Sequence, residues 1–213
     1  MRSAVRDFTP SGVRRSLEES LARLRLDRVD RLLLHDPQNA EDGGVAAYRE
    51  LEEMREEGLT DAIGIGINQN EYARPFVGEH QLDVILLAGR WTLLDRSASA
   101  WLLPRCRDLG IDVAAAGVFN TGVLADPDSP DARFDYAPAS QQIRERARRI
   151  RQFCTAYGVS LPAAAIQYPF TDPAVTSVII GAATPEQVRA NTESLEHAAP
   201  EALWAALATG IQS

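Results

Sequence analysis

Short hydrophobic runs alternate with amphipathic segments along the whole chain. The run at residues 29–34 lies between charged residues and has the length of a strand that is buried on both faces. Similar runs follow at residues 62–67, 83–89, 112–118 and 175–180. Between them, apolar residues recur at spacings of three and four, as in amphipathic helices. The pattern therefore predicts five strands that alternate with helices.

Several predicted helices have clear start and stop signals. Thr9 precedes Pro10 as an N-cap, and Gly58 ends a helix that begins near residue 45. Thr184 and Gln187 have the spacing of a capping box. Strict alternation of helices with apolar strands indicates a parallel sheet covered by helices, which we expect to form a single domain over residues 1–213.

The ends of the predicted strands carry the residues best suited to chemistry. They are His35, Asn68, Trp91, Phe119, Asn120 and Gly181. Each has a simpler explanation: a strand-end histidine can merely hydrogen-bond nearby backbone, a tryptophan can belong to the core, and an asparagine can form a turn. Because the carboxyl ends of parallel strands converge on one side, we expect these residues to form a site.

Three other segments invite a functional interpretation. The N–H groups of residues 181–183 start a capped helix and could favour an anion, although an ordinary capped helix would look the same. The arginine-rich helix at residues 139–157 could bind phosphate, but its helical period favours a solvated face. The loop at residues 125–138 has the length of a lid or a binding surface.

Composition excludes several classes of function. The net charge of −8 and the lack of a basic block argue against nucleic acid as a partner. No apolar run could cross a membrane, and the first residues lack the core of a signal peptide, so we expect a cytoplasmic protein. Cys106 and Cys154 fit reduced, packed thiols, and no cluster has the spacing of metal ligands.

Six motifs, in order along the chain, resemble those of the aldo-keto reductase family, near its bacterial branch of sugar and pyridoxal dehydrogenases. They are SLEESLARL (16–24), VDRLLLHDP (29–37), AIGIGINQ (62–69), LAGRWTLLD (87–95), VFNTGVL (118–124) and IIGAATPEQVRAN (179–191). The resemblance implies a partial TIM (β/α)8-type barrel, with about five parallel strands corresponding to strands four to eight. It also implies hydride transfer between NAD or NADP and a small carbonyl or sugar-like alcohol.

The resemblance assigns roles to the strand-end residues. His35 matches the catalytic histidine that orients the substrate carbonyl oxygen, Asn68 the residue that holds the nicotinamide carboxamide, and Trp91 the aromatic ring that stacks on the nicotinamide. Residues of the pyrophosphate-side loop are Phe119, Asn120, Gly122 and Leu124, and those of the adenosine-side segment are Gly181, Ala183, Gln187 and Asn191. Ala183 stands where a basic or hydroxyl residue often faces a 2′-phosphate, which mildly favours NAD over NADP.

The sequence departs from the family pattern at its start. The family's catalytic Asp, Tyr and Lys have no counterpart, and all 22 basic residues are arginine. We therefore expect an N-terminally truncated reductase or dehydrogenase. One alternative is a short relative without redox activity, which uses the pocket around His35 for non-redox catalysis or ligand binding. Another is a non-catalytic assembly protein. Five strands leave open sheet edges, so we expect a homo-oligomer or a partner chain that covers them.

Overall fold

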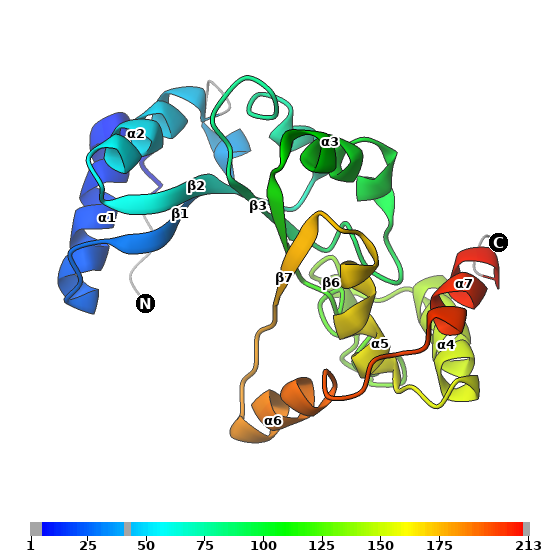
Figure 1. Ribbon diagram of the computed structural model, residues 1–213. Coiled ribbons are helices and arrows are strands. Elements are labelled where there is room, and N and C mark those ends of the chain that lie inside the picture. Colours follow the sequence, from blue (N-terminus) through cyan, green and yellow to red (C-terminus); the bar gives the residue numbers. More distant parts are fainter. Residues whose placement is uncertain (1–5, 41–43, 211–213) are drawn as a thin grey trace.

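The computed structural model of the protein describes residues 6–40 and 44–210. Both ends of the expected domain, residues 1–5 and 211–213, lie outside the described residues. Five strands form one parallel sheet in the order β1-β2-β3-β4-β7, as the alternating pattern predicts (Figure 1). They are β1 (Val29–His35), β2 (Thr60–Ile67), β3 (Val84–Ala88), β4 (Asp112–Ala116) and β7 (Val175–Ile179).

Seven α-helices are found in the part of the chain that the structure describes. They are α1 (Pro10–Leu24), α2 (Val45–Glu56), α3 (Leu102–Leu109), α4 (Gln141–Ala156), α5 (Leu161–Gln167), α6 (Pro185–Glu193) and α7 (Glu201–Gly210). The predicted caps are present: the Thr9 hydroxyl accepts from the Gly12 N–H at 3.1 Å, and Gly58 follows α2 with φ +80°.

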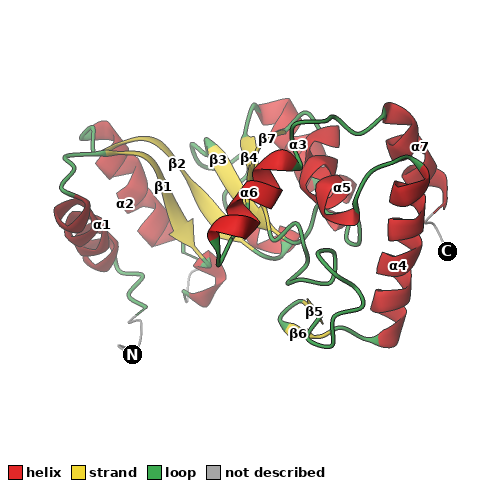
Figure 2. Ribbon diagram, turned by 90° about the horizontal axis from the view of Figure 1, so that it is seen from below, coloured by secondary structure: helices red, strands yellow, loops and turns green. Residues whose placement is uncertain are grey.

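The hydrophobic core has two main parts. In the first, α2 packs on β1 and β2 and α3 packs on β4, while α1 lies on α2. In the second, α4, α5 and α7 pack together beyond the sheet, and Figure 2 shows α4 and α7 side by side. Cys106 belongs to the first part and Cys154 to the second; both are buried free thiols, as predicted.

Strand β1 corrects one prediction. The run at residues 29–34 was expected to be buried on both faces, but only Leu34 of this strand is buried. The reason is its position, because in the described sheet β1 has a neighbour on one side only. A hollow of about 830 Å³ opens beside it, between β1 and α1. Exposed edge strands of this kind tend to associate with other chains.

The loop at residues 125–138 contains a short hairpin of β5 (Arg133–Phe134) and β6 (Ala137–Pro138). The solvated face predicted for the arginines of α4 is found only in part: the side chains of Arg148 and Arg151 are 40% exposed, but most of the arginines also hold this loop. Arg144 donates to the carbonyl oxygens of Pro127, Ser129, Pro130, Ala132 and Ala139, at 2.5 to 3.4 Å. Arg148 and Arg151 both pair with Asp128 at 2.6 Å. Arg149, in contrast, is exposed as predicted.

Candidate functional site

A small cavity of about 170 Å³ lies at the carboxyl ends of β2, β3 and β4. The strand ends line it on one side and the β5–β6 hairpin on the other. The lining residues are Asn68, Gln69, Ala88, Gly89, Arg90, Gly117, Asn120, Thr121, Asp135 and Tyr136. Asn68 follows β2 and Asn120 follows β4, and the structure brings these two predicted residues together at one cavity.

Backbone strain is concentrated around this cavity. Six described residues other than glycine have positive φ, and four of them line it: Asn120 at 45°, Thr121 at 65°, Asp135 at 49° and Tyr136 at 65°. Such conformations are unfavourable for residues with a Cβ, above all for a β-branched threonine. Strain of this kind persists where the surrounding structure enforces it, and it clusters at functional sites.

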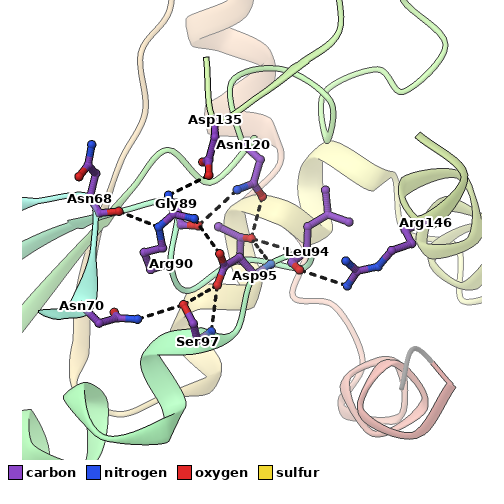
Figure 3. Close-up of polar contacts among 11 residues, drawn as sticks. Asn68, Asn70, Gly89, Arg90, Leu94, Asp95, Ser97, Asn120, Asp135 and Arg146 are labelled. Carbon is purple, nitrogen blue, oxygen red and sulfur yellow. Dashed lines mark hydrogen bonds and ion pairs between the residues drawn. The ribbon is translucent and has the colours of Figure 1, made fainter. Parts of the chain in front are cut away.

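Arg90 connects the parts of the cavity wall. Its Nε donates to the carbonyl oxygen of Asn68 at 2.6 Å, and its two terminal nitrogens donate to Asp95 and Asp135 at 2.8 Å each (Figure 3). The residue is only 8% exposed, so these bonds are largely shielded from water. One guanidinium group thus joins the end of β2, the segment after β3 and the hairpin.

A second set of hydrogen bonds fixes the Asp95 carboxylate. Its Oδ1 accepts from the Ser97 N–H at 2.9 Å and from the Ser97 hydroxyl at 2.6 Å, and the Asn70 amide donates to that hydroxyl at 3.0 Å (Figure 3). Burial acts to raise the pKa of Asp95, but the bonds from Ser97 and Arg90 outweigh it and hold this pKa below its ordinary value. Burial likewise opposes the charge on Arg90, but the two carboxylates raise the pKa of Arg90.

Asn120 is part of the cavity wall rather than a free polar group. Its side chain is 2% exposed; Oδ1 accepts from the Thr92 hydroxyl at 2.7 Å, and Nδ2 lies 3.4 Å from the Gly89 carbonyl oxygen. The amide therefore ties the end of β4 to the end of β3. Asn120 also forms a turn, the simpler explanation for this residue, since its N–H donates to the Gly117 carbonyl oxygen at 2.8 Å and its φ is 45°.

The other predicted residues of this region lie mostly in the core. The Trp91 indole donates to the Pro169 carbonyl oxygen at 3.1 Å, and its half-buried ring lies 5.2 Å from that of Tyr168. Phe119 is half-buried and the Leu124 side chain is fully buried. Gly122 has φ 120° and forms an isolated bridge with Arg133 at the base of the hairpin.

His35 does not line the cavity. Its side chain is 82% exposed, and Nε2 lies 3.5 Å from the nearest Asp36 carboxylate oxygen. The ring borders the hollow between β1 and α1. A Cβ on Gly66, the partner of His35 on β2, would lie 3.2 Å from His35 Nδ1, so the glycine leaves room for this ring.

The predicted adenosine-side segment is exposed. Gly181, Ala183 and Gln187 all face solvent, and α6 has no buried residue. Figure 1 shows this helix at the end of the segment that follows β7, and it contacts α5. The Gln187 N–H donates to the Thr184 hydroxyl at 3.3 Å, but the Gln187 side chain accepts from the Ala183 N–H at 2.7 Å rather than from Thr184. Asn191 is half-buried on the same helix.

Eight of the ten cavity residues were not predicted as site residues, among them Arg90, Thr121, Asp135 and Tyr136. Arg90 directly follows the third predicted strand, so its position could have identified it as a candidate site residue. Asp135 and Tyr136 stand between two-residue strands that have no recognisable hydrophobic pattern. Their place at the cavity depends on the fold of the loop at residues 125–138.

Comparison with known proteins gives consistent matches. A model of the aldo/keto reductase family matches residues 2–209. D-threo-aldose 1-dehydrogenase from a Pseudomonas species is 42% identical over 205 residues, which cover 95% of this chain and 62% of that protein. Pyridoxal 4-dehydrogenase from Microbacterium luteolum is 37% identical, with coverages of 95% and 63%. This chain thus spans less than two thirds of the length of these relatives.

Solved structures share the fold. A glycerol dehydrogenase from Gluconobacter oxydans is 21% identical and superimposes with a TM-score of 0.79, covering 98% of this chain and 66% of that one. An aldo-keto reductase from Bacillus halodurans gives a TM-score of 0.78 at 20% identity, with coverages of 98% and 69%. No helix within the described ranges is long and apolar enough to span a membrane. The same residues contain no group of three or more His, Cys, Asp or Glu placed to hold a metal ion.

Proposed function

The chain belongs to the aldo/keto reductase family, and from this premise we propose that it forms the cofactor-side part of an NAD(P)-dependent reductase or dehydrogenase. The proposed substrate is a small carbonyl compound or a sugar-like alcohol. The strained, polar cavity at the ends of β2, β3 and β4 carries this proposal. The aldose and pyridoxal dehydrogenases among the relatives support the substrate class.

The residues around the cavity fit a nicotinamide cofactor. Asn68 lines the cavity, and its amide could both donate to and accept from a carboxamide. Its backbone is fixed by Arg90, so the amide is presented from a rigid position. Trp91 directly follows Arg90 in the chain and supplies the flat ring that is proposed to lie against the nicotinamide. When bound, the cofactor would supply the hydride acceptor or donor, which no side chain provides.

His35 is the proposed orienting residue for the substrate oxygen. Its ring is exposed at the end of β1, and Gly66 leaves space beside it. A neutral imidazole can donate one hydrogen bond to a carbonyl oxygen and thereby polarise it. The aldo-keto mechanism also needs a proton donor of matched pKa, and general acid–base catalysis contributes about 10²–10⁴-fold to the rate. The lysine that assists this step in the family is not present in the sequence.

The segment from Gly181 to Asn191 is proposed to bind the adenosine side of the cofactor. In this segment Ala183 offers no charge or hydroxyl to a 2′-phosphate, so we propose a mild preference for NAD over NADP. The Ala183 N–H is already bonded to Gln187, which leaves fewer free donors for an anion at this turn.

Titration of the purified chain with NADH and NADPH tests the proposal. We expect quenching of tryptophan fluorescence by cofactor, tighter binding of NADH, and weaker binding in Asn68→Ala. Gln142→Ala, at an exposed position of α4, is the matched control and should bind as wild type. If neither cofactor binds at millimolar concentration, the redox function of this chain by itself is rejected.

A second candidate function is favoured by the exposed His35 ring, which borders the hollow between β1 and α1. On this reading the chain binds a small ligand at the strand ends, or uses His35 for a non-redox step, without hydride transfer. Ligand binding without any cofactor binding would favour it. Within residues 6–40 and 44–210, the outer edges of β1 and β7 have no strand partner, which supports self-association or a partner chain in either case. Light scattering tests this point, since a stable monomer would contradict it.

A further inference from the structure

Asp36 has a backbone conformation that is unfavourable in two ways. Its φ is 51° and its ψ is 55°, although the next residue is Pro37. Residues with a Cβ are strained at positive φ, and the residue before a proline is pushed towards extended conformations. Of the six positive-φ residues other than glycine in the described ranges, Asp36 alone neither lines the strand-end cavity nor ends an α-helix. The cavity therefore does not explain this strain.

The Asp36 carboxylate does not serve the turn that follows it. The residue occupies the N-cap position of the short 3₁₀ helix Pro37–Asn39, but its side chain makes no capping hydrogen bond. Only its backbone holds the turn: the N–H donates to the Gly66 carbonyl oxygen at 2.9 Å, and the carbonyl oxygen accepts from the Asn39 N–H at 3.1 Å. The turn would therefore form equally well with glycine, which adopts positive φ without strain.

The partner of this carboxylate is the imidazole of His35. The distance from Nε2 to the Asp36 Oδ2 is 3.5 Å, and the Asp36 side chain is 22% exposed. Within residues 6–40 and 44–210 this carboxylate makes no hydrogen bond and no other ion pair. Two other charged residues that line the hollow, Asp7 and Arg15, pair with each other at 2.7 Å. Since a mostly buried carboxylate is costly without a partner, the histidine accounts for the charge at Asp36.

The two ring nitrogens of His35 have different surroundings. Nε2 faces the carboxylate, whereas Nδ1 lies over Gly66, the residue beside His35 on β2, where a Cβ would come within 3.2 Å. No residue in the described part of the chain hydrogen-bonds to Nδ1. Asn68, the proposed holder of the nicotinamide carboxamide, follows two residues after Gly66. The open nitrogen thus lies beside the part of β2 that leads to the proposed cofactor position.

We propose that Asp36 is a positioning residue for His35, whose carboxylate takes the Nε2–H and leaves Nδ1 to face the substrate oxygen. The hydrogen bond made by one imidazole nitrogen determines which nitrogen carries the proton. The neutral ring then offers a lone pair at Nδ1, which accepts from the hydroxyl of an alcohol, whereas donation to a carbonyl oxygen requires a second proton on the ring. This inference rests on the proposed function, and of its two substrate classes it favours the sugar-like alcohol.

The first test reads the position of the proton. The sequence has three histidines, so His35→Gln identifies the His35 signals in long-range ¹H–¹⁵N spectra at pH 8. We expect the wild type to carry the proton on Nε2, and the two ¹⁵N shifts to move towards each other in Asp36→Gly as the tautomers mix. Asp30→Asn, at an exposed position of β1, is the matched control and should leave both shifts unchanged. Because glycine also removes the strain, Tm of Asp36→Gly should rise by about 1–4 °C.

A ligand titration then tests which nitrogen meets the substrate. Glycerol, which has only hydroxyl groups, is added with NADH, and acetone, which has only a carbonyl group, is added with NAD⁺, because neither pair can react. We expect glycerol to shift the Nδ1 signal of the wild type and to leave the Nε2 signal in place, and acetone to shift neither. In Asp36→Gly, glycerol should shift both signals.

Each other result has a defined meaning. Identical tautomers in the wild type and Asp36→Gly, a glycerol response at Nε2 of the wild type, or an acetone response at Nδ1 would overturn the proposal. A fall in Tm of Asp36→Gly would show that the carboxylate serves the fold, which also overturns it. If NADH does not bind but the tautomer depends on Asp36, the positioning role stands and the redox function fails. If NADH binds and glycerol shifts neither nitrogen, the redox function stands and this inference fails.

Discussion

Replacing Arg90 by alanine tests whether one buried guanidinium group holds the candidate site together. The change removes a hydrogen bond to the Asn68 carbonyl oxygen and ion pairs to Asp95 and Asp135. Breaking a buried ion pair costs about 3–5 kcal/mol. The Asp95 carboxylate is 18% exposed, and after the substitution it still accepts two hydrogen bonds from Ser97. Both features lower the cost of removing its ion pair with Arg90. Asp135 is 43% exposed, so its pair contributes at most about 1 kcal/mol.

The expected loss of unfolding free energy is therefore about 3 kcal/mol. For a chain of 213 residues this corresponds to a fall in Tm of about 6–12 °C. Urea denaturation followed by circular dichroism measures it, with Arg149→Ala as the matched control because that arginine is exposed on α4. If Arg90→Ala were no less stable than this control, the inferred role of Arg90 would be refuted. A double-mutant cycle with Asp95→Asn should give a coupling of about 1–3 kcal/mol, and zero coupling would exclude the ion pair as the cause.

Three further predictions concern the loop, acid stability and the thiols. Arg144→Ala should speed proteolysis within residues 127–139 several-fold while Arg149→Ala does not, because five carbonyl oxygens each lose one hydrogen bond. The pKa of Asp95 in the folded protein lies below its ordinary value of 3.8. Its contribution to the free energy of unfolding is therefore complete above pH 3.8 and is lost as the pH falls below that value. In Asp95→Asn the urea midpoint should therefore depend less on pH in this acid range. Burial raises the pKa of Cys106 to about 12 and that of Cys154 to about 11, so Ellman's reagent at pH 8 should label neither thiol before unfolding and both afterwards.

The sheet could be predicted because hydrophobic periodicity determines which segments become strands and helices. Five apolar runs gave five parallel strands in chain order, and Thr9 and Gly58 mark helix ends as expected. The burial of the apolar run at residues 29–34 could not be predicted in the same way. An apolar run has the same pattern at an edge as at the centre of a sheet, and only its neighbours decide how much is buried.

The cavity was harder to predict because polar contacts, not periodicity, create it. Sequence reasoning placed Asn68 and Asn120 at strand ends, and both line the cavity. It treated the arginines of α4 as solvated, since helix periodicity cannot reveal a loop that folds back onto them. Asp135 and Tyr136 lie in that loop, and their positions depend on bonds from Arg90 and Arg144.

Two groups of residues around the cavity should respond in opposite ways to substitution. Arg90 and Asn120 make buried hydrogen bonds that hold the strand ends, so removing them lowers stability whether or not a ligand exists. Tyr136 is strained and exposed, so we expect its replacement by glycine to raise stability. A purely structural cavity would contain residues of the first kind alone. The strained residues of the second kind, held in place by the first, are therefore a physical reason to expect a binding site at these strand ends.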